Sequence, residues 1–192
     1  MQNMTSSPII VGIMIGIFFA GIGIGFAVFQ SPSQPNQDTD SELERYKMAE
    51  QLASQHLKTF DELDFDVFTN QKWDRLHESH SQDITVHWPD GRTTVGIDPH
   101  IEDLKAMFVY APDTRIEQHP IKIASGQWTS VVGVIEGTFT EPMPLSDGNS
   151  IAPTGKPFKI TMCTVGYWEN GVMTEEYLFW DNLEFMKQIG LA

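Results

Sequence analysis

One long apolar run near the N-terminus limits what this chain can fold into more than any other feature. Residues Ile9 to Phe29 contain no charged or strongly polar side chain over 21 residues. A helix of that length rises about 31 Å, which is roughly the hydrocarbon thickness of a bilayer. A globular core rarely needs such a segment. We therefore predict a membrane-spanning helix at residues 9–29, after a short tail at residues 1–8.

A secretory signal peptide is the alternative for this segment. Signal peptides have a basic N-terminal region, a shorter apolar stretch and a small-residue cleavage site. Here no Lys or Arg precedes Arg45, and Ala27-Val28-Phe29 is a poor cleavage site. These features favour an uncleaved, single-pass anchor. Few basic residues flank it, so the positive-inside rule constrains the orientation only weakly, and we expect the folded domain on the extracytoplasmic side.

A polar segment separates the apolar run from the rest of the chain. Gln30 to Asp40 carries two prolines and no apolar residue, which is typical of a flexible linker. Residues 41–192 then form the folded domain, which is long enough to bury a core. The net charge of −14 argues against a nucleic-acid partner, because phosphate binding needs a basic surface. The single cysteine, Cys163, excludes an intramolecular disulfide.

Hydrophobic periodicity in residues 41–192 predicts helices first and strands afterwards. A capping box at residues 41–44 opens a helix with apolar residues at helical spacing. Asn170-Gly171 between two alternating runs predicts a β-hairpin, and a last helix covers about residues 182–189. Helices followed by an antiparallel meander indicate an α+β fold in which helices cover one face of a curved sheet. Such a sheet leaves a concavity that suits a small apolar ligand.

The last predicted strand carries residues that could do chemistry. Alternation places one set on a single face: Glu175, Tyr177, Phe179 and Asp181. If this set faces the pocket, a carboxylate lies among aromatic rings. Its pKa is then raised, because apolar surroundings disfavour the charged form, and it can exchange protons near neutral pH. Three further residues could reach the pocket as proton shuttles or hydrogen-bond donors: His87, His119 and Tyr110.

Simpler structural roles are open for the same residues. Asp181 precedes Glu184 by three residues at the start of an apolar helix, the pattern of an N-terminal cap. Histidines on strands, such as His87 and His119, are often hydrogen-bonded structural residues. His80 lies in a polar stretch and is expected at the surface. No spacing of His, Cys and carboxylates predicts a metal site, and no glycine-rich loop predicts a nucleotide cofactor.

Five short motifs follow one another over residues 68–191. They are Val86-His87-Trp88-Pro89-Asp90-Gly91, Ala111-Pro112-Asp113, Gly137-Thr138-Phe139, Pro153-Thr154-Gly155-Lys156, and a tail from Gly171 through Asp181 to Gln188-Ile189-Gly190. In this order they resemble the SnoaL-like polyketide cyclases, also called ester cyclases, of the nuclear transport factor 2-like superfamily. The tail is the most specific of the five pieces.

The resemblance implies a cone-shaped α+β barrel with an apolar pocket, often paired into a homodimer through the sheet. It also implies an intramolecular aldol ring closure without metal or cofactor, in which the aspartate at the position of Asp181 is the general acid/base. The enolate would need hydrogen-bond donors, for which His119, His87 and Tyr177 are candidates. The remaining expected ligand contacts are Tyr177, Phe179, Glu175, Tyr110 and Trp88.

Three kinds of function fit these observations. The favoured one is a cofactor-free cyclase- or isomerase-like enzyme that acts on a small apolar carbonyl compound, with Asp181 as acid/base. The second is a membrane-tethered pocket that binds a lipid-like molecule without turnover. The third is a dimerisation or partner-docking module. The substitution Asp181→Asn separates the first two, because only the enzyme would lose turnover.

Overall fold

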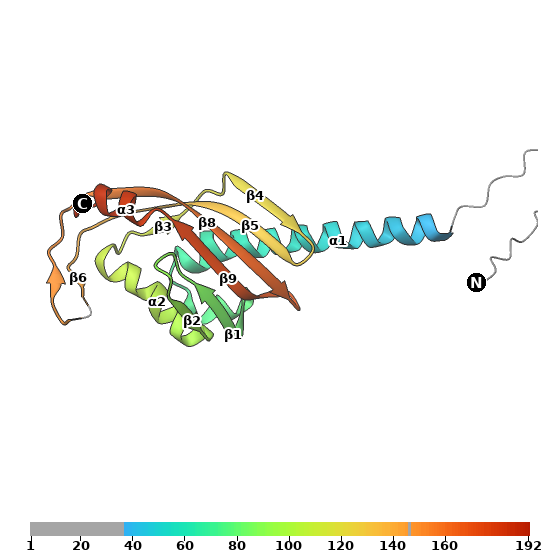
Figure 1. The fold of residues 1–192 in the computed structure, drawn as a ribbon, viewed down its shortest axis with the longest axis horizontal. Coiled ribbons are helices and arrows are strands. Elements are labelled where there is room, and N and C mark those ends of the chain that lie inside the picture. The colour runs from blue at the N-terminus through green and yellow to red at the C-terminus, as the bar shows by residue number, and fades with distance from the viewer. Residues whose placement is uncertain (1–36, 146) are drawn as a thin grey trace, which may run out of the picture. The chain divides into compact units, whose positions relative to one another are not determined.

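A seven-stranded mixed sheet forms one layer of the fold, and helices cover one of its faces (Figure 1). The computed structural model describes residues 37–145 and 147–192. Its elements are, in chain order, α1 (Gln37–Glu62), the π-helical turn η1 (Leu63–Phe68), the 3₁₀ helix η2 (Trp73–Glu78), β1 (His80–His87), β2 (Thr93–Val95), α2 (Ile97–Tyr110), β3 (Arg115–Ile116), β4 (Ile121–Ser125), β5 (Trp128–Thr138), β6 (Met143–Pro144), β7 (Ser150–Ile151), β8 (Pro157–Glu169), β9 (Val172–Trp180) and α3 (Asn182–Gln188).

The strand order is β2-β1-β9-β8-β5-β3, and β4 also pairs with β5. The predicted hairpin is confirmed: β8 and β9 are antiparallel, and Asn170 and Gly171 between them both have positive φ, as a type I′ turn requires. The expected meander is incomplete, however, because β1 runs parallel to β9. The first strand of the domain therefore joins the sheet beside the last. The expected mixed α+β class, with helices on a curved sheet, is confirmed.

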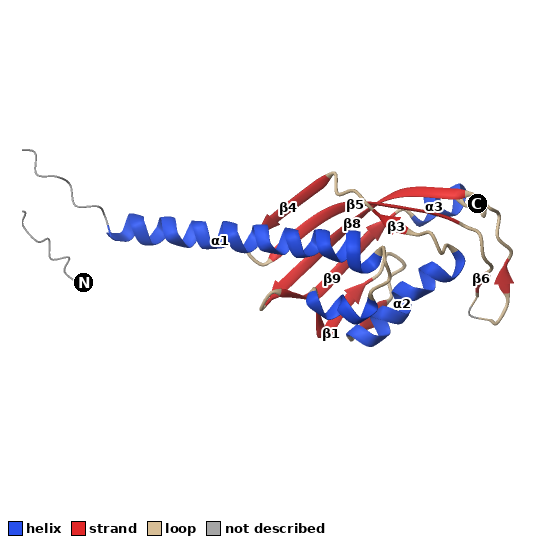
Figure 2. Cartoon of the chain, turned by 180° about the vertical axis from the view of Figure 1, so that it is seen from behind, coloured by secondary structure: helices blue, strands red, loops and turns tan. Residues whose placement is uncertain are grey.

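Helix α1 packs along the sheet over β4 and β5 with its C-terminal half, while its N-terminal half extends beyond the strands (Figure 2). The helix begins at Gln37, so the last residues of the predicted linker are helical. Acidic residues such as Asp40 suit this position, because the N-terminal end of a helix carries partial positive charge. Leu43 and Tyr46, on the projecting half, are exposed.

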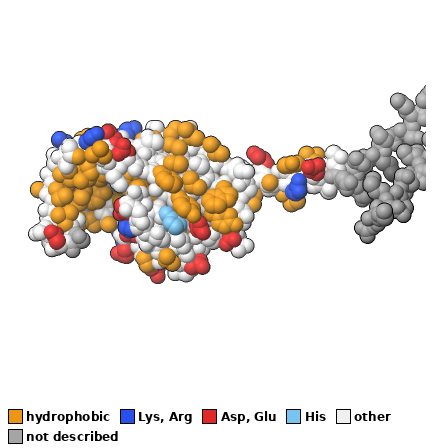
Figure 3. Space-filling view, viewed as in Figure 1, with side chains coloured by type: hydrophobic (Ala, Val, Ile, Leu, Met, Phe, Trp, Pro, Cys, Tyr) orange, Lys and Arg blue, Asp and Glu red, His pale blue; other side chains and the backbone are white. Residues whose placement is uncertain are grey.

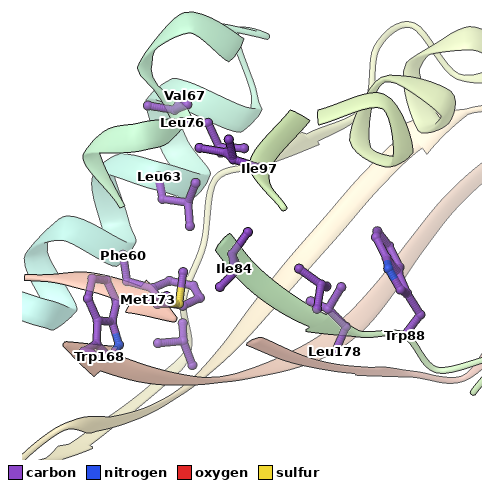
Figure 4. Packing of buried hydrophobic residues seen from close by; sticks show 12 residues of the cluster. Phe60, Leu63, Val67, Leu76, Ile84, Trp88, Ile97, Trp168, Met173 and Leu178 are labelled. Atoms are coloured by element: carbon purple, nitrogen blue, oxygen red, sulfur yellow. The ribbon is translucent and has the colours of Figure 1, made fainter. Parts of the chain in front are cut away.

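The core fills the space between the sheet and the helices in two clusters. The first lies under the C-terminal half of α1, where Phe60 and Leu63 meet Trp168, Met173 and Ile84 (Figure 4). The second lies between α3 and the C-terminal end of α2. It contains Phe108, Ile135, Phe139 and Phe158. From Thr129 onward, β5 alternates regularly between buried and half-buried residues, so this strand sends every second side chain to the helix side.

The predicted membrane anchor at residues 9–29 lies outside the described residues. Within residues 37–192, no helix is both long and apolar enough to cross a bilayer. The anchor, the linker before Gln37 and the membrane location therefore stay predictions.

Candidate functional site

A cavity of about 280 Å³ lies between the helix-facing side of the sheet, η1 and α2. Its volume is close to the lower end of the range of ~300–1,000 Å³ that small-molecule pockets occupy. Most of its wall is apolar, including Phe68, Leu104, Met107, Ile135, Ile160 and Leu178. The polar side chains in the lining are Asp64, His80, Asp90, Arg92, His100, Asp103, Tyr110, Thr164, Glu176 and Asn182.

Strand β9 sends Glu176, Leu178 and Trp180 into this cavity. Leu178 pairs with Thr164 of β8, which also lines it, and Glu176 pairs with Val86 on the buried side of β1. The expected alternation is present, but the set facing the cavity is the opposite of the one expected. Which set of side chains faces the cavity depends on the strands and helices that pack against β9. Both sets contain an acid and an aromatic residue, so alternation alone does not distinguish them.

The expected ligand contacts Glu175, Tyr177 and Phe179 lie on the outer face of the sheet. The Tyr177 hydroxyl donates a hydrogen bond to Glu175 at 2.6 Å, and the Tyr177 ring stacks on His87 with centroids 4.3 Å apart. Phe179 is 53% exposed. The structure thus brings these residues together with His87, but on the side of the sheet away from the cavity.

Asp181 caps α3. Its Oδ1 accepts a hydrogen bond from the Glu184 N–H at 2.9 Å, and the side chain is exposed and does not line the cavity. The alternative interpretation of Asp181 as an N-terminal cap is therefore confirmed. Trp88 and Tyr110, in contrast, do line the cavity, as the sequence led us to expect. Burial raises the pKa of Tyr110 to about 12, so its hydroxyl keeps its proton at neutral pH.

His119 lies behind the cavity wall between two carboxylates. Its Nδ1 is 2.8 Å from Asp61 Oδ1, and its Nε2 is 2.8 Å from Asp64 Oδ2. A neutral imidazole has one N–H, so both contacts are hydrogen bonds only when the group of three holds an additional proton. Burial alone would lower the pKa of His119, but the hydrogen bonds to Asp64 and Asp61 outweigh it and raise that pKa. His119 thus reaches the cavity only through Asp64.

Asp64 is the buried acid of η1 that the sequence did not single out. Burial raises the pKa of its carboxyl group more than the hydrogen bond from His119 lowers it. The shifts at Asp64 and His119 have the same direction, so the pair keeps a proton to higher pH than two separate side chains would. Only Oδ2 of Asp64 is engaged by His119. Oδ1 has no hydrogen bond within the described part of the chain, and Asp64 lines the cavity.

A second buried polar group on the cavity wall consists of His80, His100 and Glu176. Glu176 Oε2 is 3.6 Å from His80 Nε2 and 3.4 Å from His100 Nε2. Burial lowers the pKa of His100 to about 4, so this imidazole is neutral at pH 7. At Glu176, burial raises the pKa, but the neighbouring His80 and His100 outweigh it, and the pKa is lowered. His80 is 2% exposed, so its expected surface position is wrong.

Within the described residues, these three side chains form a group that could hold a metal ion. No metal site was predicted from the sequence. They come from β1, α2 and β9, so no local spacing marks them. For Asp64, a usable signal was its position within Leu63-Asp64-Phe65-Asp66-Val67-Phe68, where an acid stands among apolar neighbours. A carboxylate in such a run is either paired or functional.

Several solved structures share this fold. A protein ascribed to the SnoaL-like polyketide cyclases, from Jannaschia sp. CCS1, superposes with a TM-score of 0.64 at 18% identity, over 73% of this chain and 95% of that one. IdmH of Streptomyces antibioticus, ascribed to the polyketide cyclases, gives 0.60 at 19% identity, over 70% of this chain and 98% of IdmH. A protein of Xanthomonas campestris with the same ascription gives 0.61 at 15% identity, over 72% and 99%.

The comparison with curated proteins gives no match. At 15–19% identity, the solved structures show a shared fold and nothing finer. The sequence itself gives the more direct result, because the family model for the SnoaL-like polyketide cyclases matches residues 58–189, from the end of α1 to the end of α3. The match covers more than half of the chain and includes the whole cavity wall, and it shows that this chain belongs to the SnoaL-like polyketide cyclase family.

Proposed function

We propose that the protein is an enzyme of the cyclase or isomerase type, which moves a proton at the carbon next to a carbonyl group of a small apolar substrate. Asp64 is the general acid/base in this proposal. The observation that carries it is the position of Asp64: a buried carboxylate on the wall of a largely apolar cavity, backed by His119. A cone-shaped barrel around the cavity and a membrane tether at residues 9–29 complete the proposed arrangement.

The surroundings of Asp64 suit proton transfer. Removing a proton next to a carbonyl needs a base that is stronger than an ordinary aspartate, and burial raises the pKa of Asp64 in that direction. His119 holds Oδ2 at 2.8 Å, which fixes the plane of the carboxylate and leaves Oδ1 for the substrate. The apolar side chains around it disfavour the charged carboxylate, which makes Asp64 a stronger base once it has lost its proton.

The developing enolate oxygen also needs a hydrogen-bond donor inside the cavity. Tyr110 offers one, because its hydroxyl stays protonated and makes no hydrogen bond to any described residue. The hydroxyl of Thr164, 1% exposed on β8, is a second donor on the same wall. Donors held in place before the reaction stabilise the charge as it forms. The cavity therefore contains both a base and oxyanion partners.

The proposed function is tested by proton exchange. The protein is incubated in D₂O with a panel of small cyclic ketones and β-dicarbonyl compounds, and loss of the α-proton signal is followed by NMR. We expect accelerated exchange of at least one compound that fits the cavity. Leu104→Trp, which fills the cavity from α2, should abolish it, whereas Val109→Trp, at an exposed position of the same helix, should not.

Two results would contradict this proposal. Compounds that bind without any exchange would favour the non-catalytic binding module. Exchange that survives Leu104→Trp as well as Val109→Trp would place the reaction outside the cavity.

The homodimer predicted from the sequence also stays a prediction, and the outer face of the sheet is where we expect it. One row across β4, β5, β8 and β9 consists of Ile121, Val132, Cys163 and Phe179. Phe179 and Ile121 are more than half exposed, and Figure 3 shows apolar side chains gathered over the strands on this face. Contiguous apolar surface of this kind is common at protein interfaces.

Phe179→Glu is expected to convert a dimer into a monomer, because it places a charge in this apolar row at a position that is more than half exposed. Sedimentation velocity measures the change. Val109→Glu, on the exposed side of α2, is the matched control and should leave the mass unchanged. A wild-type chain that sediments as a monomer at all concentrations would refute the dimer, and a dimer that survives Phe179→Glu would place its interface elsewhere.

A further inference from the structure

We propose that His80, His100 and Glu176 together bind one divalent transition-metal ion with the ligand preference of Zn²⁺. The three side chains converge from β1, α2 and β9 onto the wall of the cavity. The inference goes beyond the proposed function, because proton transfer by Asp64 does not require the ion.

The spacing of the ligand atoms fits an ion better than it fits hydrogen bonds. Glu176 Oε2 lies 3.4 Å from His100 Nε2 and 3.6 Å from His80 Nε2. Hydrogen bonds between nitrogen and oxygen are usually about 2.7–3.2 Å long. Ligands held about 2.0–2.2 Å from a tetrahedral Zn²⁺ are separated by about 3.4 Å. All three ligand atoms lie within 4.8 Å of one another. A small displacement of the side chains is therefore enough to bring the ligand nitrogens of His80 and His100 to the same spacing.

Two of the ligand atoms are buried without a partner. His80 Nε2 and Glu176 Oε2 make no hydrogen bond within residues 37–145 and 147–192. The side chains of His80 and Glu176 are 1% and 7% exposed. Buried polar atoms are almost always satisfied, so an orphan pair aimed at the same point indicates a missing partner. A cation at that point would satisfy the imidazole lone pair and the carboxylate oxygen together.

A hydrogen bond at the second ring nitrogen of His80, Nδ1, can leave Nε2 free to bind a metal ion. Ser79 Oγ donates to the Leu76 carbonyl oxygen at 3.2 Å and lies 2.9 Å from His80 Nδ1. When the hydroxyl directs its own hydrogen at the Leu76 carbonyl, it can accept the hydrogen of His80 Nδ1. This tautomer leaves the lone pair on Nε2, which then cannot donate a hydrogen bond to Glu176. Metal-bound histidines characteristically have such a partner on the second ring nitrogen.

The donor set selects the class of ion. Two imidazole nitrogens and one carboxylate oxygen suit Zn²⁺ and other late divalent ions, whereas Mg²⁺ and Ca²⁺ prefer oxygen ligands throughout. Three protein ligands are the number found in open sites, where the remaining position is taken by water or substrate. Because all three residues line the cavity, that position faces the space that a ligand would occupy.

The test uses the full chain, purified without a polyhistidine tag and stripped with a chelator. After dialysis against ZnCl₂, the metal content is measured by mass spectrometry, and Co²⁺ serves as a visible-absorption probe of the ligand geometry. We expect one Zn²⁺ per chain and the absorption of Co²⁺ bound by nitrogen and oxygen ligands. His100→Gln and Glu176→Gln should each weaken binding by at least about 100-fold, since even outer-shell partners contribute 10–100-fold.

His87→Gln is the matched control, because His87 lies on the same β1 strand but stacks on Tyr177 at the outer face. It should retain one ion per chain. The proposal is overturned if the wild-type protein retains no Zn²⁺, or if His87→Gln loses as much Zn²⁺ affinity as His100→Gln. The wild-type measurement decides even where a variant fails to fold. If the protein binds no metal but still catalyses exchange that depends on Asp64, only the metal site is rejected. If it binds metal but catalyses no exchange, only the proposed function is rejected.

Discussion

Asparagine in place of Asp64 is expected to slow α-proton exchange by a factor of about 10²–10⁴, the usual contribution of a general acid or base. The amide has the size of the carboxylate, and its oxygen can still accept a hydrogen bond from His119 Nε2, which lies 2.8 Å from Asp64 Oδ2. It cannot take up a proton from the substrate. Affinity for the same compound, measured by titration, should change only a few-fold, so the loss should appear in the rate of exchange.

Asp181→Asn is the matched control for this experiment. Asp181 lies outside the cavity as the N-cap of α3, and asparagine is an equally good cap, so both rate and stability should stay close to those of the wild type. The pH profile provides a second check. Wild-type exchange should rise as Asp64 loses its proton, at a pH above 3.8 because burial raises the pKa of this carboxyl group. If only Asp181→Asn loses exchange, the acid/base role returns to Asp181.

Phe60→Ala is expected to destabilise the domain by about 3–5 kcal/mol, the usual cost of removing a buried phenylalanine side chain. Phe60 is 1% exposed and joins α1 to the sheet through the first core cluster (Figure 4). Its removal leaves a cavity between the helix and the strands, which the long α1 cannot close without moving. Urea denaturation followed by circular dichroism measures the change in the free energy of unfolding.

Leu43→Ala, on the projecting half of the same helix, is the control for this prediction. Leu43 is 50% exposed, and substitutions of this kind usually change the free energy of unfolding by less than about 0.5 kcal/mol. Equal losses in the two variants would show that the free half of α1 is stabilised by contacts outside the described residues. A loss below about 1 kcal/mol for Phe60→Ala would contradict the packing of α1 against the sheet.

Local patterns predicted the elements of the fold well, because each depends on a few neighbouring residues. The turn at Asn170-Gly171 needs only two positions with positive φ, and the cap at Asp181 needs only the next three residues. The family resemblance rested on motifs of the same local kind and was confirmed by the family model. These features depend on chemistry within one turn or one hairpin.

The face of β9 that lines the cavity could not be read in the same way. The strand offers Glu175 and Tyr177 on one side and Glu176 and Trp180 on the other, and alternation alone does not say which side is buried. The answer depends on pairing with β8 and β1 and on the helices that cover only one face. Four residues of the expected site, His87, Glu175, Tyr177 and Phe179, therefore lie on the outer face. Asp181 caps α3, His119 lies behind Asp64, and Trp88 and Tyr110 line the cavity.

The buried polar groups of the cavity were missed for a related reason. His80, His100 and Glu176 belong to three elements, while Asp64 lies in η1 and His119 in the loop between β3 and β4. Their proximity is a product of the tertiary fold, so no spacing in the sequence could mark them. A metal prediction based on local motifs finds sites on one helix or loop and overlooks sites assembled in this way.

The parallel pairing of β1 with β9 has a consequence for how the molecule is made. Thr85 lies beside Glu175, so a further 90 residues (175 − 85), nearly half of the chain, must be synthesised before β1 meets its second neighbour, β9. Contacts between such distant segments close large loops and slow the search for the native state. During translation, the edge of β1 that will pair with β9 stays unpaired until β9 leaves the ribosome. A nascent chain stalled before β9 would expose that edge, and we would look there for chaperone dependence.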